Sequence, residues 1–203
     1  MYISENASKE EVKLKFNEFK NSLHPDKEER PTFTGDAVAR KDVRDYESNW
    51  SAVAKGVARY PDLAEKALDI ADKAVELKRK NCSSLGLYSA LSDIYQARPD
   101  LGERIIGVTD KALSNCKHEP YALSGSVYLL NTLAQDHKLE VNAIDVFSRN
   151  LNPTLSHVEG KHNIDFMYNT EADSRVLMEM QGRREKFIST SISTRPSRGN
   201  EGR

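Results

Sequence analysis

A stretch of fifteen residues occurs twice in this chain, 38 positions apart. Residues 61–75 read PDLAEKALDIADKAV, residues 99–113 read PDLGERIIGVTDKAL, and seven of the fifteen positions are identical without a gap. Another 38 residues on, HKLEVNAIDVFSRNL keeps the apolar positions and loses the polar ones. Such a period indicates stacked helix pairs, because a single pair cannot bury its own apolar face.

Each repeat is predicted to consist of two helices. The first has apolar residues at helical spacing, as in Leu87, Leu91 and Ile94. The second starts at Pro-Asp, because proline fits the first helical turn and aspartate faces the positive helix end. Nine apolar residues should be buried at equivalent places: Leu63, Leu68, Ile70, Leu101, Ile106, Val108, Leu139, Ile144 and Val146. The sequence therefore predicts an all-α protein, a helical hairpin followed by an α-solenoid of about three 38-residue helix-pair repeats.

Four segments are predicted along the chain. They are a helical hairpin at 1–47, the repeat array at 48–152, an irregular segment with a C-terminal helix at 153–188, and a disordered tail at 189–203. The array should end before Pro153, since the residue preceding a proline is pushed out of the helical region. The tail is rich in Ser, Thr, Arg and Gly and has no apolar period, which is typical of disorder.

The overall composition favours a cytoplasmic protein that binds neither a membrane nor nucleic acid. The formal charge of −1 does not favour nucleic acid, and the chain has neither a long apolar run nor the apolar core of a secretory signal. The two cysteines, Cys82 and Cys116, are too few for a disulfide scaffold and are expected to be reduced thiols.

No motif for catalysis or for a cofactor is found. The chain lacks a Gly-rich phosphate loop, H-E-x-x-H and G-x-S-x-G. Cys116 and His118 are neighbours, but a turn does not by itself orient a thiol and its base. His157 and His162 could supply metal ligands, yet no matching pair occurs elsewhere. We therefore predict no enzyme activity, no catalytic residue, no metal site and no cofactor.

The N-terminal residues predict two packed helices joined by a polar tip. Ser8 and Glu11 have the spacing of a capping box, which starts a helix. Two apolar stripes at helical spacing follow, on either side of the tip: Val12, Phe16, Phe19 and Leu23, then Val43, Tyr46, Trp50 and Val53. The tip itself contains His24-Pro25-Asp26-Lys27.

About the first 55 residues resemble a J-domain without its first helix. NASKEEVKLKFNEFKNSLHPDK is similar to the second helix and the His-Pro-Asp loop of that family, and KDVRDYESNWSAV is similar to its third helix. The resemblance implies that His24, Pro25, Asp26 and Lys27 dock on a seventy-kilodalton heat-shock ATPase and stimulate ATP hydrolysis. A J-like hairpin that only caps the array is an alternative.

Three functions are consistent with these features. The leading hypothesis is a non-enzymatic protein–protein interaction module that uses the α-solenoid surface, with Tyr88, Tyr95, Tyr121 and Tyr128 as candidate contact residues on the repeat face. A second is the J-like co-chaperone. A third is a microbial effector that binds a host protein in the host cytosol, which rests only on the small size and the architecture.

Overall fold

The computed structural model describes residues 1–23, 37–77, 85–115, 120–159 and 171–193, and all of the regular structure in these ranges is helical. The elements are α1 (Lys9–Ser22), α2 (Ala37–Arg59), η1 (Pro61–Leu63), α3 (Ala64–Glu76), α4 (Leu85–Ala97), η2 (Pro99–Leu101), α5 (Gly102–Asn115), α6 (Pro120–Leu133), α7 (Glu140–Glu159) and α8 (Glu171–Ser193). The all-α prediction is therefore confirmed, and the description of the helix pairs as an α-solenoid stays a prediction.

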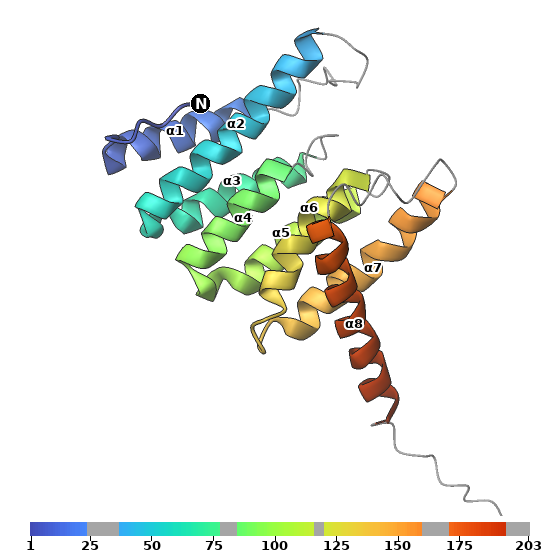
Figure 1. The fold of residues 1–203 in the computed structure, drawn as a ribbon. Coiled ribbons are helices and arrows are strands. Elements are labelled where there is room, and N and C mark those ends of the chain that lie inside the picture. The colour runs from blue at the N-terminus through green and yellow to red at the C-terminus, as the bar shows by residue number, and fades with distance from the viewer. Residues whose placement is uncertain (24–36, 78–84, 116–119, 160–170, 194–203) are drawn as a thin grey trace, which may run out of the picture.

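The helices stack in two layers (Figure 1). The first helices of the pairs, α2, α4 and α6, lie side by side and form what we call the first-helix layer. The second helices α3, α5 and α7 lie side by side as well, and α1 packs against α3, so these four form the second-helix layer. Helix α8 packs against α6 and α7 at the C-terminal end. Each pair thus buries its apolar face against the next pair along the chain.

The helix starts follow from the local sequence. The Ser8 side chain accepts a hydrogen bond from the Glu11 backbone N–H at 3.3 Å, and Glu11 Oε2 accepts one from the Ser8 N–H at 2.7 Å, which completes the predicted capping box. Pro61 and Pro99 each begin a short 3-10 turn that leads directly into the second helix of its pair. The repeated Pro-Asp-Leu therefore performs the same turn twice.

The core matches the predicted positions closely. Eight of the nine apolar residues expected at equivalent places are buried, and Leu101 is partly buried. At the N-terminal end, Phe19 packs edge-on against Trp50 with ring centroids 5.1 Å apart, and Tyr46 lies 5.8 Å from Trp50. The two predicted aromatic stripes therefore meet between α1 and α2.

All three predicted segment boundaries fall inside a helix. The boundary at residue 47 cuts α2, which carries the hairpin stripe and is also the first helix of the first repeat. Helix α7 runs through Pro153, since an internal proline removes one hydrogen bond and bends a helix without always ending it. Helix α8 continues past residue 188 to Ser193, and the rest of the predicted tail lies outside the described residues.

Candidate functional site: the groove between α2 and α4

Charged side chains of the second-helix layer pair with each other from one repeat to the next. Lys111 on α5 lies 3.3 Å from Asp72 on α3, and Arg149 on α7 lies 3.4 Å from Asp110 on α5. These two ion pairs are the same contact repeated, because both the acids and the bases are 38 residues apart. The repeated Asp-Lys of the sequence thus joins neighbouring repeats.

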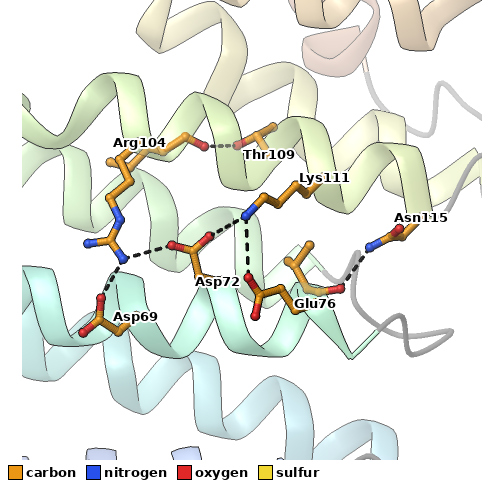
Figure 2. A network of polar contacts seen from close by, with 9 residues as sticks. Asp69, Asp72, Glu76, Arg104, Thr109, Lys111 and Asn115 are labelled. Carbon is orange, nitrogen blue, oxygen red and sulfur yellow. Dashed lines mark hydrogen bonds and ion pairs between the residues drawn. The ribbon is translucent and has the colours of Figure 1, made fainter.

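Further polar contacts extend this seam between α3 and α5 (Figure 2). The Arg104 guanidinium donates hydrogen bonds to Asp69 at 2.6 Å and to Asp72 at 2.9 Å. At the other end of the same seam, the Asn115 amide donates to the backbone carbonyl of Val75 at 2.9 Å. We call these contacts, with the Asp72–Lys111 and Asp110–Arg149 pairs, the polar ladder. Its charges are directed at one another, so the repeated polar residues have a structural role.

Asp72 should contribute modestly to stability through this ladder. Replacing Asp72 with Asn removes the ion pairs to Arg104 and Lys111, which are partly exposed, so we expect a loss of about 0.2–1 kcal/mol in the free energy of unfolding. The loss should shrink at high salt, because salt screens exposed charges. Urea unfolding of both proteins at two salt concentrations measures it, and Glu18→Gln, which breaks only a pair within α1, serves as the control. A loss that does not depend on salt would contradict the electrostatic explanation.

The first-helix layer has an open groove between α2 and α4. The groove has a volume of about 360 Å³. Helix α2 lines the groove with Glu47, Ser51, Ala54, Lys55 and Ala58. Helix α4 lines it with Gly86, Ser89 and Asp93. Most of these side chains are small, so a partner's backbone could approach both helices closely.

A glycine sets the close approach of the two helices at one end of the groove. A Cβ on Gly86 would overlap the Glu47 carboxylate and lie 3.1 Å from the Cβ of Trp50. The Gly86 backbone N–H donates a hydrogen bond to Glu47 Oε2 at 2.7 Å. This bond ties the carboxylate to the groove and leaves its other oxygen available.

Asp93 has a carboxylate that nothing in the described part of the chain neutralises. It is half-buried in the groove, and no hydrogen bond or ion pair joins it to any described residue. Burial raises the pKa of this carboxyl above its ordinary value, and no nearby charge offsets the effect. Lys55 lines the same groove without forming an ion pair with it. The groove thus contains one ammonium and two carboxylates, one of which is unpaired.

Lys55 and Asp93 occupy the same place in successive repeats. Asp93 lies 38 residues after Lys55, and Asn131 on α6 lies 38 residues after Asp93. Asn131 is buried, and its amide donates a hydrogen bond to Glu179 Oε2 on α8 at 3.1 Å. Of the three equivalent polar side chains, only the one covered by a further helix has a partner among the described residues.

The residues of the predicted J-like loop were His24 to Lys27. His24, Pro25, Asp26 and Lys27 all lie outside the described residues. The helices on either side of the loop are described and pack through their aromatic residues as expected.

The four predicted tyrosines do not form one surface. Tyr88 is buried, because it stands 38 residues after Trp50 and points into the same core, so its assignment to the repeat face was wrong. Tyr95 is half-buried, and Tyr128 is 42% exposed. Tyr121 lies in α6, but its side chain is outside the described part of the structure.

The sequence contained a signal for the groove that the tyrosine pattern obscured. The 38-residue period extends into the first helices, where Ser51 and Ala52 recur as Ser89 and Ala90. Ala52 and Ala90 are buried, whereas Ser51 and Ser89 are exposed and line the groove. The same period places Lys55 and Asp93 on the same face of successive first helices.

Comparison with protein-family models, with curated proteins and with solved structures finds no match to this chain. None of the described helices has the length and apolar character needed to cross a membrane. Among the residues that the structure describes, no three side chains of His, Cys, Asp or Glu gather as metal ligands would.

Proposed function

We propose that this chain is a non-enzymatic protein-binding module whose partner docks on the first-helix layer, over the groove between α2 and α4. The observation that supports this proposal is the difference between the two layers. In the second-helix layer the repeated charges pair with one another across the polar ladder. In the first-helix layer Lys55 and Asp93 have no partner among the described residues.

The lining of the groove suits a peptide segment better than a small molecule. Ligand pockets for small molecules are enclosed and mostly apolar, whereas this groove is open along two helices. Ala54 and Ala58 leave space for a partner's chain, and the Ser51 and Ser89 hydroxyls can donate to or accept from its polar groups. Helical arrays commonly bind other proteins along such extended surfaces.

An arginine placed in the groove should abolish partner binding. Ala58 is exposed on α2, so Ala58→Arg fills the groove without disturbing the core. Gly107→Arg is the matched control, because Gly107 is exposed on α5 and a side chain there meets no atom within 4 Å. Proteins retained by the immobilised wild-type chain should be lost with Ala58→Arg and kept with Gly107→Arg. Equal retention by both variants would contradict the proposal.

A J-like co-chaperone is the second candidate, and the packing of α1 against α2 favours it. Phe19, Tyr46 and Trp50 form a cluster that holds the two helices flanking the His-Pro-Asp loop, as a presented loop requires. The test is ATP turnover by a purified seventy-kilodalton heat-shock ATPase with wild type and with His24→Gln. We expect little stimulation, because residues 9–20, which resemble the family's basic second helix, hold three Glu beside four Lys. Strong stimulation that vanishes in His24→Gln would place the co-chaperone first.

A further inference from the structure

The unpaired carboxylate of Asp93 indicates what kind of partner fits the groove. A carboxylate that loses part of its hydration without gaining a hydrogen bond or a counter-charge weakens the folded state. Asp93 is in this position, since it is half-buried and unpartnered among the described residues. A cationic side chain in the groove would supply the missing contact.

The other charged groups of the groove are compatible with a cation. Glu47 at the opposite end keeps one carboxylate oxygen free of the Gly86 bond and adds a second negative charge. Lys55 is exposed, and its long flexible stem allows the ammonium to stay in water while the groove is occupied.

The described part of the chain contains an example of this kind of contact. Asn131, the counterpart of Asp93 in the next repeat, is covered by α8, and Glu179 of that helix accepts its hydrogen bond. The position can therefore be covered by a helix that brings a complementary polar group. For a carboxylate, the complementary group is a cation, and Arg binds carboxylates with two parallel hydrogen bonds.

We propose that the groove between α2 and α4 binds a segment of a partner protein that presents an Arg or Lys side chain, and that this side chain pairs with Asp93. The inference rests on the proposed function and specifies the chemistry of its partner. Arg is the better fit of the two, because its planar guanidinium matches a carboxylate and is more weakly hydrated than an ammonium.

In the free protein, Asp93→Asn should raise the Tm at neutral pH. A pKa that is raised in the folded state means that the ionised carboxylate favours unfolding, so its removal stabilises the fold. The gain should disappear as the pH falls below the ordinary aspartate pKa of about 3.9, where the carboxyl is protonated in both states. Glu47 and Lys55, which face the groove, are unchanged in the variant. Thermal unfolding at both pH values measures this, and a lower Tm at neutral pH would show that Asp93 has a stabilising partner.

Binding of peptides to the full chain tests the proposal directly. Random linear peptides displayed on phage are selected on the immobilised wild-type protein. Peptides that do not bind the Ala58→Arg variant are kept as groove ligands. We expect these peptides to be rich in Arg or Lys. Replacing the basic residue with norleucine, or Asp93 with Asn, should weaken binding about tenfold or more. Asp145→Asn removes the same charge from α7, where Asp145 pairs with Arg149, and should leave binding unchanged.

The outcomes separate this inference from the function on which it rests. Groove ligands without a basic residue, or with equal affinity for wild type and Asp93→Asn, would overturn the proposed chemistry and leave protein binding in the groove intact. Selected peptides that Ala58→Arg does not block would contradict the groove itself, and therefore both proposals.

Discussion

Replacing Trp50 with alanine should reduce the free energy of unfolding by about 3–5 kcal/mol. The Trp50 side chain is fully buried, and its ring packs edge-on against Phe19 and Tyr46 at 5.1 and 5.8 Å. The Cβ of Trp50 also faces Gly86 where α2 and α4 meet, so this residue lies where α1, α2 and α4 come together. Its loss leaves a cavity that rigid helices cannot fill. Urea unfolding followed by circular dichroism measures the change.

Trp50→Phe is the matched control for this cavity. The indole Nε1 of Trp50 is buried and has no hydrogen-bond partner, so phenylalanine keeps most of the ring contacts and removes an unsatisfied donor. We expect Trp50→Phe to cost clearly less than Trp50→Ala. Equal losses in the two variants would mean that the donor has a partner and that packing is not the dominant contribution.

Replacing Ile106 with alanine should cost about 2–5 kcal/mol. Ile106 is 6% exposed on α5 and belongs to the core between the two layers. It is also one of the residues whose burial the repeat predicts. Denaturant unfolding measures the loss, and a value far below this range would show that α5 is rotated relative to the structure.

Substitution of Gly107, the residue after Ile106, should raise the free energy of unfolding instead of lowering it. Gly107 is exposed, and a Cβ there meets no atom within 4 Å. Gly107→Ala should therefore raise the free energy of unfolding by about 0.8–1 kcal/mol, because alanine favours an exposed helix interior over glycine. A large loss of stability with Ile106→Ala and a gain with Gly107→Ala would confirm which face of α5 is buried. Destabilisation by both changes would contradict this orientation of α5.

The fold was predictable where one local rule acts on each repeat alike. Pro61 and Pro99 start the same turn, and the apolar residues that follow each of them are buried at matching places. The repeated Asp-Lys could be recognised in the sequence, but the residues with which it forms ion pairs could not. Lys111 pairs with Asp72 of the preceding repeat, and only the stacking of α3 on α5 brings them together.

The predicted segment boundaries fall inside helices because local signals compete with tertiary packing. A proline at residue 153 predicts a helix end, yet α7 continues to Glu159. The residues of α7 before the proline are buried against the neighbouring helices, as Ala143 and Phe147 are, so the helix is already held by packing where the proline occurs. Similarly, the hairpin stripe and the first repeat share α2, and the recurrence of Ser51 and Ala52 as Ser89 and Ala90 was the sequence signal for joining them.

The candidate site was less predictable than the fold. The spacing of the tyrosines predicted that Tyr88 lies on the repeat face, but Tyr88 belongs to the core. Asp93 is notable because no described residue forms a hydrogen bond or an ion pair with it, which is a property of the packed structure rather than of any motif. Its alignment with Lys55 at the 38-residue period was the available signal.

Site-specific photo-crosslinking tests most directly whether partners bind the first-helix layer. A photoreactive amino acid is placed at position 89, where Ser89 is exposed in the groove, or at position 107 on the second-helix layer, where the side chain points into open space. The partner docked over the groove should crosslink from position 89 and not from position 107. Crosslinks that form mainly from position 107 would contradict binding over the groove.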